Sequence, residues 1–436
     1  MINLIKKLLI LKFFFFFGTP LMAFSSSNFL ISQSAFKNHD YSASISSFST
    51  NQIQLSNSNL IDKVISAVVT EDIDLAHKIA LQILSKDSDN QEAYIVRLTY
   101  LYSNKKFNKI KEIYKTSKDN NELVDFIFFN DDELKNSTTI SKSLVDIVVS
   151  SFSNADPKLL NYNFLLFYTS LAKIIDDQND RATLIKGELF QNVEQSEIAE
   201  ETLLIIPSAS PYYLDAQRSL AINYSNFLPY DEALIKIKKL ILNNNNDYSL
   251  KKILADFYRV EKKYELAIGL YNEMINQKKE DLWNIYYRRG ICFERIGNWD
   301  SAENDFLSSL DIKPDSANVL NYLAYGWVER EIKLDQSLQM LETAYKANPD
   351  SYYIIDSLAW VHFKKNNLDE AARLMEIVID KAPGEAISLD HLGDIYYAMN
   401  RKREAIYFWK QALELAEPYD EIEYNVQSKL DKNNAG

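Results

Sequence analysis

Glycine and proline are scarce in this sequence: each occurs 9 times in 436 residues, about 2%, where roughly 7% and 5% are typical. So few glycines argue against a β-rich fold, which needs many tight turns. They also leave no phosphate-binding loop, because neither G-x-G-x-x-G nor G-x-x-x-x-G-K occurs. The scarcity therefore excludes the nucleotide-binding domains that depend on such loops.

Cysteine and histidine are also rare, since Cys292 is the single cysteine and the 4 histidines show no metal-ligand spacing. This argues against a zinc site, a disulfide framework and haem attachment. The formal net charge of -13 argues against nucleic acid as a partner. We expect no cofactor, no metal and no catalytic residues. What is abundant is apolar sequence, 47% of all residues, which is enough for a large core.

The first 25 residues have the organisation of a secretory signal peptide. Three lysines and no acidic residue precede the short apolar block 13–24, and Ala23 and Ser25 then place small residues two positions apart. The block is shorter than the roughly 20 residues that span a bilayer. We expect cleavage, a periplasmic location and no stable membrane span afterwards. An uncleaved N-terminal anchor is the alternative.

Small residues recur through the C-terminal half with a constant period of 34 or 35 residues. One series is Ala221, Ala255, Gly290, Ala324, Ala359 and Gly393, and a second is Ala233, Ala267, Ala302, Ser337, Ala371 and Ala405. Proline closes three of the units, at Pro314, Pro349 and Pro383. The period predicts pairs of helices that cross at the small residues, where a larger side chain would hold the backbones apart. Arg289 departs from the pattern, because it stands where most units have leucine.

The pattern resembles the tetratricopeptide repeat, with its L-G-x-x-Y and A-x-x-x-F signatures and its terminal proline. One unit shows the resemblance best, through Gly290, Phe293, Trp299, Ala302, Phe306, Leu310 and Pro314. The resemblance implies an all-α fold, a right-handed α-solenoid of helix–turn–helix repeats. Six such units cover residues 211–418, and a C-terminal capping helix and tail are expected at 419–436.

Upstream of these units the period weakens. Apolar residues keep helical spacing through 59–206, for which we predict degenerate helical repeats, with a separate helical domain as the alternative. The segment 205–211 contains two prolines and is the candidate boundary. Residues 26–58 are rich in serine and asparagine and are predicted to be flexible or weakly helical.

The resemblance also implies a concave groove lined by the first helix of each unit. Mapped onto the last four units, the groove positions are Tyr287, Asn318, Asn321, Tyr325, Tyr353, Asp356, Trp360, Phe363, Asp390 and Asp394. Aromatic faces, asparagine amides and carboxylates suit capture of a peptide segment. The alternative for each residue is packing against the adjacent unit. The final two units are acidic and aromatic at these positions, so the expected ligand is basic or apolar there.

The function predicted from these features is that of a non-catalytic exported scaffold that binds proteins or peptides. The last three units, residues 321–383, are similar to repeats of exported proteobacterial tetratricopeptide proteins. That similarity implies a role in cell-envelope assembly or proteolysis, with an envelope protease or its substrates as partner. Two alternatives remain: an enzyme whose helical catalytic region lies in 59–206, and a membrane-anchored assembly factor with an uncleaved N-terminal helix.

Overall fold

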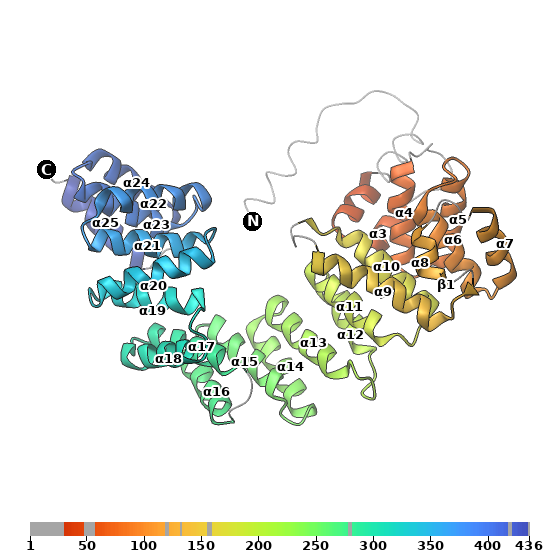
Figure 1. The fold of residues 1–436 in the computed structure, drawn as a ribbon, viewed down its shortest axis with the longest axis horizontal. Helices are drawn as coiled ribbons and strands as arrows, with labels where there is room; N and C mark the ends of the chain where they lie inside the picture. Colours follow the sequence, from red (N-terminus) through yellow and green to blue (C-terminus); the bar gives the residue numbers. More distant parts are fainter. Residues whose placement is uncertain are drawn as a thin grey trace. The chain divides into compact units, whose positions relative to one another are not determined.

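The chain divides into two compact units, called here the N-terminal unit (residues 1–250) and the C-terminal unit (residues 251–436) (Figure 1). The computed structural model describes residues 30–47, 57–117, 122–130, 133–154, 159–277, 281–416 and 421–434. The predicted signal peptide, 1–25, lies outside these residues. Among the described helices, none is both long enough and apolar enough to cross a bilayer.

The N-terminal unit consists of helices joined by short turns, together with a small antiparallel pair, β1 (Phe129–Asn130) and β2 (Glu133–Leu134). Its helices are α3 (Tyr41–Ser46), α4 (Asn57–Val69), α5 (Ile73–Leu84), α6 (Gln91–Ser103), α7 (Phe107–Ser117), α8 (Glu122–Phe128), α9 (Ser137–Asn154), α10 (Tyr162–Ile175), α11 (Asp180–Asn192), α12 (Ser196–Leu204), α13 (Tyr213–Phe227) and α14 (Tyr230–Asn243). Consecutive helices pack on one another, for example α4 on α5 and α9 on α10. The helical character predicted for 59–206 is therefore confirmed.

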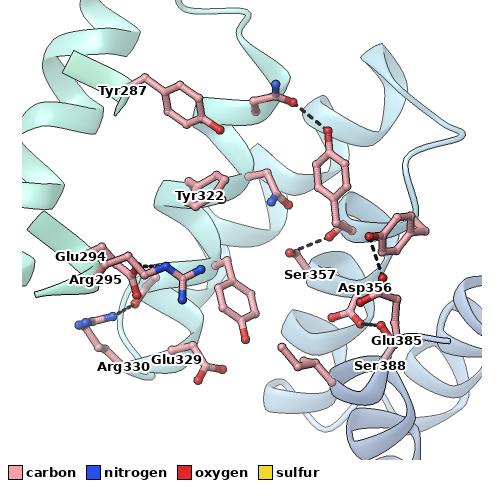
Figure 2. Close-up of a pocket in the computed structure, with 17 residues that line it drawn as sticks. Tyr287, Glu294, Arg295, Tyr322, Glu329, Arg330, Asp356, Ser357, Glu385 and Ser388 are labelled. Atoms are coloured by element: carbon pink, nitrogen blue, oxygen red, sulfur yellow. Dashed lines mark hydrogen bonds and ion pairs between the residues drawn. The ribbon is translucent and has the colours of Figure 1, made fainter. Parts of the chain in front are cut away.

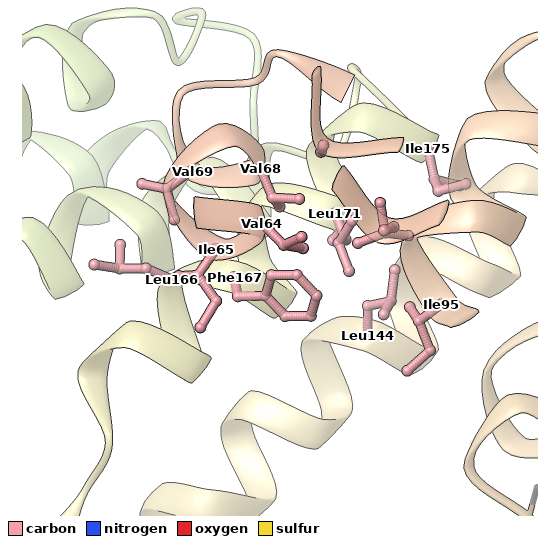
Figure 3. Packing of buried hydrophobic residues seen from close by; sticks show 14 of the residues in the cluster. Val64, Ile65, Val68, Val69, Ile95, Leu144, Leu166, Phe167, Leu171 and Ile175 are labelled. Atoms are coloured by element: carbon pink, nitrogen blue, oxygen red, sulfur yellow. The ribbon is translucent and has the colours of Figure 1, made fainter. Parts of the chain in front are cut away.

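The core of the N-terminal unit forms where α4 packs against α10 (Figure 3). Val64 and Val68 lie one turn apart on α4, Phe167 and Leu171 lie one turn apart on α10, and all four are fully buried. Burying a side chain of this size contributes about 1.5–3 kcal/mol. Since α4 and α10 are far apart in the sequence, this contact ties distant segments into one unit.

A buried lysine joins the beginning of the described chain to this core. Lys63 on α4 is fully buried, and its Nζ donates to Ser44 Oγ at 2.9 Å and to Ser32 Oγ. Ser66 Oγ in turn donates to Ser44 Oγ at 3.1 Å. The segment 26–58, predicted to be flexible or weakly helical, is therefore helical at 30–37 and 41–46, with serine side chains turned inward.

The C-terminal unit is a succession of helix pairs. Its helices are α15 (Tyr248–Val260), within which the unit begins, and then α16 (Tyr264–Asn276), α17 (Leu282–Arg295), α18 (Trp299–Ile312), α19 (Ala317–Glu329), α20 (Leu334–Ala347), α21 (Tyr352–Lys364), α22 (Leu368–Lys381), α23 (Ala386–Ala398), α24 (Lys402–Leu415) and α25 (Glu421–Asn434). Helices α18, α20 and α22 each end two residues before a proline, which cannot continue a helix. The helix pairs predicted from the period are confirmed.

The predicted crossing positions lie at helix contacts. A β-carbon built on Gly290 would come within 2.7 Å of the Phe306 ring on α18, and one built on Gly393 within 2.4 Å of the Trp409 ring on α24. Ala324 is fully buried at the equivalent position on α19. At Gly290 and Gly393 the first helix therefore lies against its second helix at a distance that only a very small side chain allows.

Arg289, which stands where most units have leucine, pairs with Asp305. Its guanidinium forms two hydrogen bonds to the carboxylate of Asp305 on α18, at 2.6 and 2.7 Å, and a third to Asn272 on α16. Asp305 is buried, and burial raises the pKa of its carboxyl although Arg289 lowers it. An ion pair thus replaces an apolar contact at this position, which holds α16, α17 and α18 together.

Substitution of Gly290 by alanine tests the close approach of α17 and α18. We expect Gly290→Ala to lower the unfolding free energy by about 1–3 kcal/mol, because the new methyl group overlaps the Phe306 ring. The matched control is Gly269→Ala inside α16, where nothing lies within 4 Å of the new β-carbon. That change should stabilise by about 0.5–1 kcal/mol, through helix propensity alone. All five tryptophans lie between Trp283 and Trp409, so tryptophan fluorescence in urea follows this unit selectively.

The pH dependence of stability tests the buried amine of Lys63. Burial lowers the pKa of Lys63 to about 8 from 10.5, although Asp62 raises it. Between these values the unfolded chain binds more protons than the folded one, so the unfolding free energy should rise with pH. Lys63→Met should make this rise smaller, whereas Lys78→Met, at an exposed position on α5, should leave it unchanged. Urea unfolding followed by circular dichroism at pH 7 to 10 measures both; parallel curves for wild type and Lys63→Met would contradict the assignment.

Candidate functional site

A cavity of about 500 Å³ opens on the first helices of four consecutive pairs in the C-terminal unit (Figure 2). Its walls come from α17, α19 and α21 and from the start of α23. On α19 the lining residues follow helical spacing, which places them on one face: Asn318, Asn321, Tyr322, Tyr325, Gly326, Glu329 and Arg330. The cavity is therefore made by the repeat geometry itself, one helical face for each unit.

Six of the ten predicted groove residues line this cavity: Tyr287, Asn318, Asn321, Tyr325, Tyr353 and Asp356. The other four, Trp360, Phe363, Asp390 and Asp394, do not. Residues that the prediction did not include are Glu294, Arg295, Tyr322, Gly326, Glu329, Arg330, Tyr352, Ser357, Glu385, Ile387 and Ser388. Helical spacing from Asn318 would have found Tyr322, four positions further along the same helix.

Trp360 and Phe363 belong to a stack beside the cavity. Trp360 is only 7% exposed, and its ring stacks on Phe363 at 4.7 Å between centroids and on His391 at 3.9 Å. Its indole N–H donates to Glu329 Oε1 at 2.5 Å. Trp360 therefore packs against the adjacent unit, because His391 of the next unit covers its face. Contact of Trp360 with a ligand stays a prediction.

Asp390 and Asp394 are paired with a base of this same chain. Lys429 Nζ on α25 lies 2.7 Å from one oxygen of Asp390 and 2.8 Å from an oxygen of Asp394. Trp409 also donates to Asp394 at 3.0 Å. Burial and the Asp394 charge raise the pKa of Asp390 although Lys429 opposes them. Contact with a ligand stays a prediction for both acids.

Asp356, on the cavity wall, forms a buried polar cluster with Ser388 and His391. Asp356 accepts from Ser388 Oγ at 2.6 Å and lies 2.9 Å from Nδ1 of His391. Burial lowers the pKa of His391, but the charge and hydrogen bond of Asp356 outweigh it and raise the pKa overall. Both Asp356 oxygens are therefore engaged, so this carboxylate acts on the cavity through its charge.

Several polar groups in the cavity have no hydrogen-bond partner among the described residues. Asn321 is 6% exposed, and its Oδ1 is buried without a hydrogen bond. Among the described residues, the hydroxyls of Tyr287, Tyr322 and Tyr325 also lack hydrogen-bond partners, whereas Tyr353 donates to Asn318 at 3.1 Å. A buried amide oxygen without a donor costs about 1–3 kcal/mol. The cavity thus retains hydrogen-bonding capacity that the fold does not use.

Two groups with chemically reactive side chains, Lys63 and Cys292, are enclosed. Lys63 and its serine partners are fully buried in the N-terminal unit. Cys292 is buried as well, and burial raises the pKa of its thiol to about 12, so it is not a ready nucleophile. Within the described ranges no three His, Cys, Asp or Glu side chains lie close enough to hold a metal ion.

The family model for the tetratricopeptide repeat matches residues 333–386 and 357–420, which span α20 to α24. Residues 333–420 of this chain are tetratricopeptide repeats. Tetratricopeptide repeat proteins are generally protein-interaction scaffolds, and the predicted all-α repeat fold is confirmed by the helix pairs and their crossing positions.

The relatives of this chain match part of it. A TPR repeat-containing protein of Pseudomonas aeruginosa is 27% identical over 166 residues, 38% of this chain and 28% of that protein. The bacteriophage adsorption protein A of Escherichia coli is 29% identical over 105 residues, 24% of this chain and 10% of that protein. Among solved structures, yeast Tom70 is 11% identical over 95% of this chain and 96% of that chain, with a TM-score of 0.42. The chain thus matches about a quarter of the Pseudomonas protein's length and a tenth of the E. coli protein's.

Proposed function

We propose that this protein is an exported, non-catalytic scaffold that holds an extended peptide segment of a partner protein in the cavity of the C-terminal unit. The observation that carries the proposal is Asn321, a buried amide with an unpaired Oδ1 on the cavity wall. A peptide main chain offers N–H donors for such an acceptor. The free tyrosine hydroxyls beside it, on Tyr322 and Tyr325, can donate to main-chain carbonyls.

The shape of the cavity supports a peptide rather than a compact small molecule. Its walls come from the first helices of four successive pairs. Tyrosine rings supply contact area with few rotatable bonds, so ordering them on binding costs little entropy. An extended segment could contact each helix in turn, which is how repeat proteins commonly use their concave faces.

We place the scaffold at the cell envelope, in assembly or proteolysis. Support comes from the N-terminal residues 1–25, with their lysines and short apolar block, and from the similarity of residues 321–383 to repeats of exported proteobacterial proteins. An envelope protease or its substrates would be the partner.

Replacement of Asn321 by leucine should separate binding from stability. The unfolding free energy should stay unchanged or rise by about 1 kcal/mol, because an unpaired buried acceptor is removed. Affinity for peptides should fall about tenfold, through loss of a hydrogen bond in the bound state. Twelve-residue peptides selected from a random display library on the purified protein are the probe, and titration calorimetry measures their binding.

The matched control is Asn304→Leu, at an exposed position on α18 that does not line the cavity. It should leave peptide affinity unchanged. Selected peptides that bind Asn321→Leu as tightly as wild type would contradict the role of this cavity.

Export has a test of its own. The mass of the protein from a periplasmic fraction should correspond to a chain that begins near Ser25 or Ser26, because cleavage is expected after the apolar block. An intact N-terminus in the membrane fraction would instead favour the anchored alternative.

A further inference from the structure

Three carboxylates converge on one end of the cavity. Burial raises the pKa of Tyr325. The negative charges of Glu329, Asp356 and Glu294 raise this pKa further, whereas the positive charge of Arg295 lowers it. These acids come from three different helices, α19, α21 and α17, and line the same cavity as Tyr325. Glu294, Glu329, Asp356 and Glu385 line the cavity, whereas its only lining bases are Arg295 and Arg330, so the described lining carries a net negative charge.

The bases that line the cavity are engaged by the protein. Arg330 donates to the carbonyl of Gly326 at 2.9 Å, and its guanidinium lies 3.9 Å from the ring centroid of Trp299. Arg295 Nε lies 3.4 Å from a carboxylate oxygen of Glu294. Glu329, in contrast, is exposed. The indole N–H of Trp360 donates to its Oε1, and its Oε2 has no partner among the described residues. One carboxylate oxygen is thus open to a ligand.

The tyrosine rings of the cavity are also open to a cation. Elsewhere in the C-terminal unit, lysines of the same chain lie over aromatic rings. Lys333 Nζ lies 4.1 Å from the ring centroid of Trp327, and Lys364 Nζ lies 5.3 Å from that of Trp360. Among the described residues, no cation lies over Tyr322, Tyr325 or Tyr353. Aromatic faces in a negative potential attract ammonium and guanidinium groups.

We infer that the bound peptide places a basic side chain, lysine or arginine, at the end of the cavity bounded by Tyr325, Glu329 and Glu294. The inference rests on the proposed function and names its specificity. The cationic head group lies against the tyrosine rings, Glu329 Oε2 accepts from it, and the unpaired Asn321 Oδ1 provides a further acceptor on the same wall. An acidic segment would instead meet three carboxylates at the same end, so its entry is disfavoured.

The test compares the selected twelve-residue peptides with analogues in which each lysine or arginine is replaced in turn by norleucine. Norleucine keeps the aliphatic length of lysine and removes the charge. At one basic position the replacement should weaken binding about tenfold, and the difference should shrink when salt is raised from 50 to 500 mM, roughly the range over which screening becomes strong.

The variant Glu329→Gln assigns this effect to the cavity. Glutamine keeps an oxygen for the Trp360 indole, so the fold should be retained, while affinity for the lysine peptide should fall about fivefold. Affinity for the norleucine analogue should not change. Glu294→Gln should act in the same direction, and Glu265→Gln, at an exposed site on α16 outside the cavity, should have no effect.

The outcomes distinguish this inference from the function on which it rests. Peptides that lose affinity in Asn321→Leu but bind equally with lysine, norleucine or glutamate would overturn the basic specificity and leave the scaffold function standing. A selected set without lysine or arginine would do the same. Failure to select any peptide would overturn both.

Discussion

Close contact between paired helices is the constraint on which the C-terminal unit depends. At Gly290 and Gly393 the facing aromatic ring fills the space that a β-carbon would need, and Ala324 is buried at the equivalent point. Because this contact fixes how each first helix lies on its second helix, it also fixes how successive first helices line up. The cavity is a consequence of that alignment, and no loop has to be ordered to build it.

The same helices contribute side chains both to the cavity and to the core. Asp356 and Trp360 lie one turn apart on α21, and both are held by His391 of the next repeat. Asn321 faces the same region on α19 but has no such partner. Paired polar groups make the wall rigid, whereas unpaired ones reduce stability and provide contacts for a ligand. Whether a side chain already has a partner in the protein therefore distinguishes structural residues from candidate binding residues better than residue type does.

The sequence predicted the helix pairs well because their requirement is local: a small residue at a fixed interval, and a proline where the second helix must end. It predicted the cavity less completely. Trp360 and Asp390 occupy groove positions by spacing, but His391 and Lys429 engage them, and those partners lie outside the repeat signature. The partner of the serine-rich segment before α4 could not be predicted either. That partner is Lys63, and a single lysine forms no pattern in the sequence. Contacts between residues 30 or more positions apart depend on the stacking angle, which spacing alone does not supply.

Helix α25 contacts α23 and α24, as α23 contacts α21 and α22, so it stands where another repeat would begin. Its Lys429 neutralises two acids that would otherwise face the next unit. The contact between α25 and α23 thus depends in part on charge, whereas the contacts within the helix pairs depend on close apolar packing.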